Sequence, residues 1–509
     1  TRTETISYHP LEPIPLGDLR KNIGYFFFHH LYEKLDITQF FLNRQRNLKI
    51  KYKLHEVFHL LVMGRLLFPG SKLKTYRRRG ELFERYPFSE DDLYRSLSVF
   101  PRYMDDLLLH LHKKVCQHYQ RHTELVYYDV TNYYFEIEEE TNMKKKGVCK
   151  SHSSNPIVQM GLLMDKQGIP ITCKLFPCNT NDNQTLLPIL DEVRKQFKIG
   201  RFIVVADKGL NTSDNVAMAI AKGDGYVFSQ SIRKSDKDAK AYCLDPSGYD
   251  TFKHLGDTFK IKSRHYPRTL YLEDKDGKKI QHPVDEKQVF FYSEKYALRA
   301  RAQRQKVLDK AAELIQSPGK YTRQQHYGAL KYILGVQVDK KGEIIETKAS
   351  LQWNEKQILE DEEYDGYYVI VTSEHQLSDQ EILSHYRGLW QIEESFRLTK
   401  SDLEARPVHV SLEDRICSHF LSCFVALLLL RLLQVETGKS IPAGQLLEAV
   451  RNMSGTEISN NLFAFDYYTD IVKKLDEAFD VNSNRRFLNT NEIRALRKQL
   501  GCSTTKKIN

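Results

Sequence analysis

Apolar residues recur at intervals of three and four over the first 120 residues and again after residue 400. The segments 54–67 and 104–119 show this spacing, which is that of amphipathic helices. The apolar stretch 420–433 is too short to cross a bilayer and contains Arg431, so we predict a buried helix there. The pattern therefore predicts helical regions toward both ends of the chain.

Between these regions the pattern changes to that of strands, dense in Val, Ile, Tyr and Phe. Two of the strands are joined by the short turn 166–168, which indicates a hairpin. The predicted elements, in chain order, are strands at 124–138, 156–165 and 168–176, a helix at about 185–197, a short apolar strand ending at Asp207, a helix capped near Thr212 or Ser213, and a strand at 225–230. This order predicts an α/β fold.

From residue 231 to about 375, short strand-like pieces rich in Lys and Tyr alternate with Gly and Asp turns. One long basic helix, predicted at 294–316, interrupts them. We interpret this stretch as an inserted β-rich module. Its Lys, Arg and Tyr residues suit the wall of a nucleic-acid channel, and a plain solvated insert is the alternative.

The segment 378–400 is predicted to form one helix. Ser378 and the glutamate three residues later form a capping box, and no proline interrupts the following twenty residues. Because seven residues nearly close two helical turns, Tyr386, Glu393 and Lys400 fall on one stripe. An acid, a phenol and an ammonium are therefore expected to face the same way.

The flanks of this helix carry apolar side chains and further positive charge. Arg387 and Arg397 lie close to the stripe. Five apolar residues can anchor the helix on a core: Leu383, Leu389, Trp390, Ile392 and Phe396. This combination suits a helix that handles phosphate, and the alternative is a solvated amphipathic helix with ordinary salt bridges.

Composition narrows the choice of partners. At 509 residues the chain should form several domains, and 76 Lys and Arg against 66 Asp and Glu give a net charge of +10, which favours a polyanion. A basic cluster in the link 68–80, beside short helices, suits contact with a DNA backbone, and a solvated loop is the alternative. Its basic residues are Lys72, Lys74, Arg77, Arg78 and Arg79.

The histidines and cysteines do not form a recognisable metal motif. The eight cysteines are scattered, without a CxxC pair or a histidine partner at zinc-finger spacing, which favours free thiols and a reduced, cytoplasmic location. His29 and His30 lie in an aromatic run and are interpreted as packed side chains. We expect no membrane association.

Three acids stand out by their positions, and the first of them, Asp129, does not help its strand to fold. Asp129 interrupts a strand, Asp207 ends an apolar strand, and Glu393 lies on the late helix. If they converge, three close carboxylates need a cation between them, and oxygen ligands favour Mg²⁺, with Mn²⁺ as a substitute. Two such ions about 3.5–4 Å apart would support attack on a phosphodiester without a covalent enzyme intermediate.

The element order and the acids together resemble the ribonuclease-H-like catalytic domain of bacterial DDE transposases, in particular the insertion-sequence-four group and its close relatives. The segment YRGLWQIEESFRLTK is similar to their signature of Tyr followed by Arg, Glu and Lys at intervals of three, four and seven. Tyr386, Glu393 and Lys400 match it. Leu389 stands at the Arg position, so Arg387 or Arg397 would have to supply that charge.

The resemblance implies cut-and-paste DNA transposition. A homodimer would bind the terminal inverted repeats, hydrolyse one strand and join the freed 3′ end to target DNA, in the bacterial cytoplasm and bound to the nucleoid. By position, the metal ligands would be Asp129, Asp207 and Glu393. The DNA contacts would come from Tyr386, Lys400, Arg387, Arg397, Trp390, Arg77, Arg78 and Arg79. Helical spacing also allows Trp390 to be a core residue.

The resulting prediction is an α/β, ribonuclease-H-like mixed sheet with a β-rich insertion, preceded by a helical domain and followed by a helical tail. The expected boundaries are 1–120, 121–230, 231–375, 376–435 and 436–509. Two alternative functions remain: a nuclease of the same fold that cuts without joining, and an inactive DNA-binding descendant.

Glu394 lies about 100° around the helix from Glu393 and is not expected to share its stripe.

Overall fold

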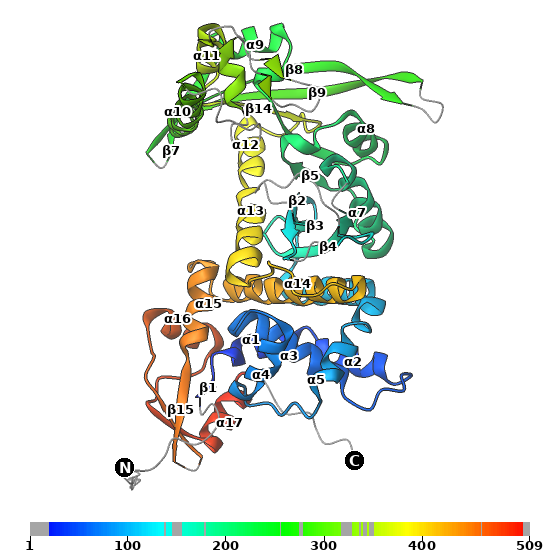
Figure 1. Ribbon diagram of the computed structural model, residues 1–509, viewed down its shortest axis with the longest axis vertical. Coiled ribbons are helices and arrows are strands. Elements are labelled where there is room, and N and C mark those ends of the chain that lie inside the picture. The colour runs from blue at the N-terminus through cyan, green and yellow to red at the C-terminus, as the bar shows by residue number, and fades with distance from the viewer. Residues whose placement is uncertain are drawn as a thin grey trace.

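The computed structural model describes residues 20–136, 139–144, 155–177, 180–254, 256–273, 278–316, 328–334, 337–338, 344–345, 351–459 and 461–501. Figure 1 shows three tiers along the long axis. The strands and helices of the insertion lie at the top, the α/β core lies in the middle, and the N-terminal and C-terminal helical regions lie below helix α14 (Glu413–Glu436).

A nine-stranded mixed sheet forms the core, in the order β4-β3-β2-β5-β6-β14-β9-β8-β7. Strands β2, β5 and β6 are parallel neighbours, and the other pairs are antiparallel. The strands are β2 (Leu125–Tyr134), β3 (Ile157–Asp165), β4 (Pro170–Pro177), β5 (Ile203–Ala206), β6 (Gly225–Gln230), β7 (Asp250–His254), β8 (Asp257–Glu273), β9 (Lys279–Ser293) and β14 (Tyr367–Thr372). The predicted mixed α/β architecture is confirmed.

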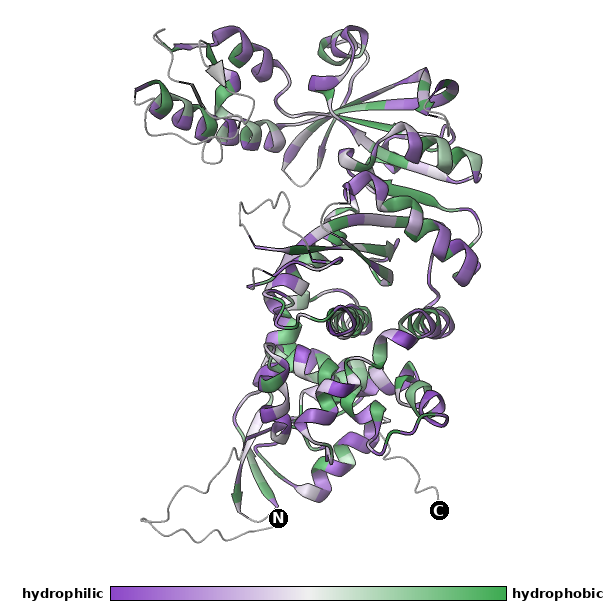
Figure 2. Cartoon of the chain, turned by 45° about the vertical axis from the view of Figure 1, so that its right-hand side comes forward, coloured by the Kyte–Doolittle hydropathy of each residue, from purple (hydrophilic) through white to green (hydrophobic). Residues whose placement is uncertain are grey.

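The helices between the core strands also follow the predicted order. Helix α7 (Leu186–Glu192) continues as a π-helical turn to Phe197, and helix α8 (Ser213–Ala221) is capped by Thr212, whose hydroxyl accepts from the Asn215 N–H. Figure 2 shows mainly apolar residues on the central strands and polar residues on the surface helices. Every residue of β3 is buried, and burial of both sheet faces explains the continuous apolar run of β5.

The strands of the insertion extend the core sheet. Strand β14 pairs with β6 on one side and with β9 on the other, both antiparallel. Where short strand-like pieces were predicted, the 17-residue strand β8 runs through Pro267, because its long pairing with β9 continues past the proline. Helix α10 (Glu294–Gln316) begins directly after β9 and has the predicted bounds.

Helices dominate the N-terminal region. They are α1 (Tyr25–Lys34), α2 (Ile37–Gln45), α3 (Leu54–Leu67), α4 (Lys72–Arg77), α5 (Glu90–Ser96) and α6 (Met104–Tyr119). The predicted basic link is not an open loop: it folds as α4, capped by the Ser71 hydroxyl, followed by a 3₁₀ turn to Glu81. The serine cap overrides the breaking effect of the preceding Pro-Gly pair.

The C-terminal region corrects the prediction of an all-helical tail. Alongside helices it contains the strands β15 (Ser454–Ser459), β16 (Leu462–Phe465) and β17 (Phe487–Asn489). These pair with β1 (Arg20–Asn22) in a four-stranded antiparallel sheet. The strands are short and β1 comes from the other end of the chain, so local periodicity carried little signal of this pairing.

Helix α14 is longer than the apolar stretch that predicted it. Its 24 residues are long and apolar enough to cross a membrane, but 94% of its most apolar window is buried inside the protein. It packs against α3 on one side and reaches the core sheet at β4 on the other. The helix therefore joins the helical tier to the α/β core, as a buried core element.

Candidate functional site

The carboxylates of Asp129, Asp207 and Glu393 line one cleft of about 760 Å³. Asp129 is the fifth residue of β2, and Asp207 directly follows β5. Strands β2 and β5 are parallel, and their last matched pair is Tyr127 with Val205, so the two aspartates stand at the same level two residues further on. Neighbouring parallel strands thus bring together two acids that are 78 residues apart in sequence.

The third acid comes from a helix that is interrupted beside the sheet. The predicted single helix is α12 (Asp379–Arg387) and α13 (Trp390–Arg397), and the capping box at Ser378 is present. Between them, the Leu389 N–H donates to the Tyr386 carbonyl, the bond of a 3₁₀ turn. A Cβ on Gly388 would collide with the Tyr127 ring. Glycine at this turn therefore lets the helix approach β2 closely.

The predicted stripe is only partly preserved. Tyr386 and Glu393 line the cleft, but Lys400 is not among its lining residues. The helix widens into a π-helical stretch, Leu398–Asp402, and the Lys400 ammonium donates to the Thr131 hydroxyl of β2. The π-helical stretch changes the rotation per residue between Glu393 and Lys400, and Lys400 reaches Thr131, two residues after Asp129 on β2.

Adjacent glutamates on α13 face different surroundings. Glu393 is exposed and lines the cleft. The Glu394 carboxylate instead accepts a hydrogen bond of 2.8 Å from Arg431 of α14, whose side chain is buried. This separation agrees with the angle expected between neighbouring helix positions.

A hydroxyl network surrounds Asp207. The Ser229 hydroxyl of β6 donates to Asp207 Oδ1 at 2.8 Å. Burial raises the pKa of Tyr386, a hydrogen bond with Ser229 partly opposes that rise, and the negative charge of Asp207 adds to it. Tyr386 therefore remains a neutral hydrogen-bond donor beside the acids across the physiological pH range.

Only one of the two candidate replacement arginines faces the acids. Arg387 lines the cleft and lies 4.2 Å from the centroid of the Phe259 ring, and burial lowers the pKa of this guanidinium. Arg397 is exposed, forms ion pairs with Glu394 and Asp402 at 3.8 and 3.4 Å, and is not among the lining residues. Arg387 is thus the cation that can compensate for Leu389.

Trp390 is not a core residue, contrary to its helical spacing. Its side chain is 59% exposed and lines the cleft. The other apolar residues predicted to anchor the helix are buried: Leu383, Leu389, Ile392 and Phe396. Trp390 stands three residues before Glu393 on α13, so it shares the helix face that lines the cleft.

The basic residues around α4 lie outside the cleft. Arg77 is exposed, Arg78 pairs with Glu81, and Arg79 lies 3.9 Å from the centroid of the Tyr76 ring. Lys72, which we expected in the exposed cluster, is buried and 3% exposed. The exposed part of the cluster is therefore smaller than the sequence indicates.

Lys72 leads to a testable prediction about stability. It is surrounded by Arg65 of α3 and by His419 and Cys423 of α14, and burial lowers its pKa to about 7, with a further lowering from Arg65. The folded pKa is thus below the unfolded one, so the burial cost is full below about pH 7 and declines as the pH rises toward 10.5.

Lys72→Met should therefore stabilise the protein near pH 7 by at least about 1.4 kcal/mol, the equivalent of one pKa unit. The gain should shrink as the pH rises toward 10. Urea unfolding of both proteins across this range measures it. A gain in stability that is independent of pH would contradict the lowered pKa of Lys72. The control is Lys74→Met, which changes an exposed position on the same helix.

Several cleft residues were not singled out by the sequence. They are Lys208, which follows Asp207 directly, and Asp257, Phe259, Lys295, Tyr296 and Arg299 from the insertion. Lys208 could have been predicted from the sequence, because it directly follows the candidate acid Asp207. The insertion residues could not have been found from the sequence, because only the extension of the core sheet by β14, β9 and β8 brings them to the acids.

The donor set fits hard divalent cations. Ligands of one Mg²⁺ lie within about 4.2 Å of each other, twice a bond of about 2.1 Å, whereas two ions about 3.5–4 Å apart allow wider spacing. Among the described residues, the group of three whose ligand atoms all lie within 4.8 Å is His29, His59 and Glu84, not the three cleft acids. The fit of the three cleft acids to such ions therefore rests on their carboxylate oxygens, which are hard ligands, and on the cleft that they share.

The histidine cluster in the N-terminal helices already has hydrogen-bond and ion-pair partners within the protein. His29 Nδ1 and His59 Nε2 are 2.8 Å apart, and Arg497 lies 3.1 Å from His29 Nε2 and 2.6 Å from Glu84. A guanidinium at this position opposes a divalent cation. Burial lowers the pKa of both imidazoles, so they form a neutral hydrogen-bonded network, consistent with packed side chains.

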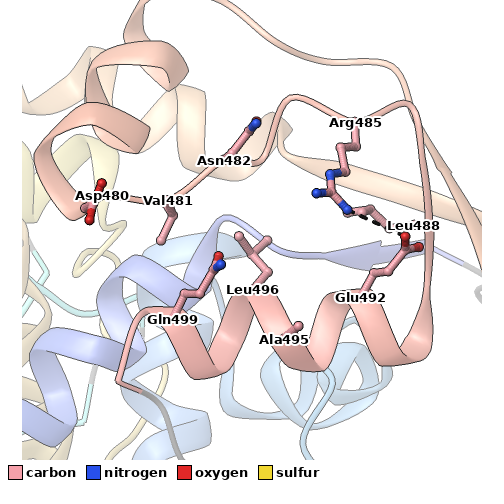
Figure 3. Close-up of a pocket in the computed structure, with 9 residues that line it drawn as sticks. All are labelled: Asp480, Val481, Asn482, Arg485, Leu488, Glu492, Ala495, Leu496 and Gln499. Atoms are coloured by element: carbon pink, nitrogen blue, oxygen red, sulfur yellow. Dashed lines mark ion pairs between the residues drawn. The ribbon is translucent and has the colours of Figure 1, made fainter.

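A second cavity, of about 280 Å³, lies between the end of helix α16 (Asp470–Phe479) and helix α17 (Thr490–Gln499). Figure 3 shows that Arg485 and Glu492 form an ion pair across it, with a separation of 3.5 Å. Its remaining lining is mostly neutral. This cavity lacks the convergent acids that distinguish the cleft between the core and the insertion.

The chain resembles known transposases in sequence and in structure. A family model described as "Transposase DDE domain" matches residues 135–429, a range that contains Asp207 and Glu393 and begins just after β2. A cryo-EM structure of the piggyBac transposase synaptic complex with hairpin DNA matches with 7% identity, covering 96% of this chain and 85% of that chain, at a TM-score of 0.37. No curated protein matches the chain significantly.

Proposed function

The chain belongs to the transposase DDE domain family, and we propose that Asp129, Asp207 and Glu393 form the metal site at which it cuts and joins DNA. It is a DNA transposase, and its family generally uses divalent metal ions. The observation that carries the proposal is that these three acids, from β2, from the end of β5 and from α13, line one cleft. Asp129 lies outside the matched family range, so its role rests on this geometry.

We propose Mg²⁺ as the cofactor, with Mn²⁺ as a substitute and two ions per site, because carboxylate oxygens are hard ligands. When bound, such ions activate the attacking oxygen and stabilise the leaving oxygen of a phosphodiester. The Ser229 hydroxyl orients the Asp207 carboxylate. The hydrogen bonds and ion pairs around Arg431 hold α13, and with it Glu393.

The surrounding residues are proposed to bind DNA. Tyr386 presents a neutral phenol and Arg387 a guanidinium in the same cleft as the acids, where both can bind a phosphate. The exposed Trp390 indole is a stacking surface for a base. Five basic residues that do not line the cleft are proposed to contact the phosphate backbone of DNA: Lys400, Arg397, Arg77, Arg78 and Arg79.

The finer classification is also a proposal. We assign the core to the ribonuclease-H-like fold and the chain to the insertion-sequence-four group, supported by three antiparallel strands followed by two parallel ones and by the Tyr386–Glu393 spacing. By the same resemblance, a homodimer would bind terminal inverted repeats and then target DNA in the bacterial cytoplasm. Short inverted repeats bounded by direct duplications in the DNA around the gene would support this assignment.

A strand-transfer assay tests the reaction. The substrate is a labelled fragment of the DNA that flanks the gene, with a supercoiled plasmid as target and Mg²⁺ or Mn²⁺ present. We expect the labelled 3′ end to become joined to the plasmid. Cutting without joining would favour a nuclease, and DNA binding with neither cutting nor joining would favour an inactive DNA-binding protein.

A further inference from the structure

Among the residues that line the cleft there is a fourth carboxylate, Asp257, at the start of β8. It is 6% exposed, and its two oxygens accept hydrogen bonds from the Ser293 hydroxyl at 2.6 Å and from the Lys295 N–H at 3.1 Å. Burial alone would raise the pKa of Asp257, but these hydrogen bonds lower it overall, so the side chain stays ionised. Asp257 is thus engaged by the protein at both oxygens.

Asp257 and Ser293 together cap helix α10. Ser293 ends β9, and its hydroxyl both donates to Asp257 and accepts from the Tyr296 N–H at 3.2 Å. The Ser293 N–H donates to the Gly366 carbonyl, which precedes β14, at 3.1 Å. Ala297 is buried beneath the same turn. The first turn of α10 is therefore fixed to the extended sheet without an intervening loop.

This turn places basic side chains in the same cleft as the three proposed metal ligands. Lys295, Tyr296 and Arg299 are exposed and line the cleft. The Tyr296 ring lies 4.6 Å from the Tyr368 ring, and the Arg299 guanidinium lies 5.8 Å from the Tyr296 ring, which limits how these side chains can turn. Without nearby cations, a cleft lined by acids would repel a polyanion.

We propose that Lys295 and Arg299 form a phosphate-binding site for the DNA backbone beside the bond that is cut, and that Asp257 and Ser293 position them. The proposal rests on the proposed function of the cleft. It assigns Asp257 as a positioning residue rather than a fourth metal ligand. It also gives the insertion a role in the active site, because its sheet extension carries α10 to the acids.

The first test compares two double variants of α10 that remove the same charge. Lys295→Ala/Arg299→Ala alters the cleft, whereas Lys306→Ala/Lys310→Ala alters exposed positions on the same helix that do not line it. The probe is a fluorescent random-sequence duplex of about three helical turns, titrated at several salt concentrations without divalent ions.

The cleft variant should bind about tenfold to a hundredfold more weakly, and the salt slope of its log affinity should fall by about two, close to 0.9 per phosphate contact. The control should change by less than about threefold. Equal losses in the two variants, or wild-type binding by the cleft variant, would overturn the proposal.

The second test separates positioning from metal binding. Ser293→Ala removes one capping hydroxyl and no carboxylate, and Asp257→Ala removes the cap itself. Both should raise the KM for DNA in the cleavage assay and leave the Mn²⁺ concentration for half-maximal cleavage within about twofold of wild type. If Asp257→Ala alone raised the Mn²⁺ requirement, Asp257 would be a metal ligand and the assignment would fail.

The outcomes distinguish this proposal from the proposed function. If Glu393→Gln still cuts DNA, the metal-site assignment fails whatever α10 does. If Glu393→Gln is inactive and Lys295→Ala/Arg299→Ala binds DNA like the wild type, only the α10 proposal fails. The binding measurements require neither cleavage nor a metal ion, so they can be interpreted in either case.

Discussion

Glu393→Gln should abolish DNA cleavage while leaving DNA binding measurable. The substitution keeps the size and hydrogen-bonding capacity of an exposed side chain in the cleft but removes the negative charge proposed to hold a divalent cation. We expect the cleavage rate to fall by about a thousandfold or more, which corresponds to about 4 kcal/mol in the activation barrier. Asp129→Asn and Asp207→Asn should have effects of similar size.

The neighbouring residue provides a matched control. Glu394→Gln makes the same chemical change one residue along α13, where the side chain accepts a hydrogen bond from Arg431 instead of lining the cleft. Glutamine can still accept that bond, so cleavage should stay within about tenfold of wild type. The measurement is single-turnover cutting of labelled end DNA, with binding followed separately by fluorescence anisotropy. Robust cutting by any of the three acid variants would reject the metal-site assignment.

Arg431→Met should produce the largest loss of stability expected here. The buried Arg431 guanidinium donates to Glu394 at 2.8 Å, to the Ser395 hydroxyl at 2.7 Å and to the Gln391 carbonyl at 3.0 Å, and so joins α14 to α13. Burial lowers the pKa of Arg431, and Glu394 opposes that shift. Without Arg431, the largely buried Glu394 carboxylate keeps only the exposed Arg397, 3.8 Å away, as a charged partner, so we expect a loss of about 3 kcal/mol, the lower end of the range for a broken buried pair.

Chemical denaturation of wild type and variant measures this cost. The double variant Arg431→Met/Glu394→Met removes the Glu394 charge as well and should recover much of the loss, because apolar replacements of a buried pair are often tolerated. A loss below about 1 kcal/mol in the single variant would show that the ion pair does not hold α13. Cleavage should fall with the single variant, since Glu393 lies on the same helix.

The candidate acids could be proposed from the sequence because each has a distinctive position. Asp129 lies within a strand, where aspartate is rare, Asp207 follows an apolar strand, and Glu393 lies on the late helix; the positions of the two aspartates on β2 and after β5 were predicted. Tyr386 and Glu393 still face the same cleft although a 3₁₀ turn lies between them. Lys400 lies beyond a second irregular turn and does not line it.

Sequence alone determined the order of core strands and helices and the bounds of α10, and it singled out the three candidate acids, since these features depend on residues that are near one another in the chain. Tertiary structure decided the remainder: the fusion of the insertion with the core sheet, the pairing of β1 with β15, and the entry of Asp257, Lys295 and Arg299 into the cleft. These features arise from strand pairing and close packing between distant segments. Periodicity within a short window does not encode such contacts.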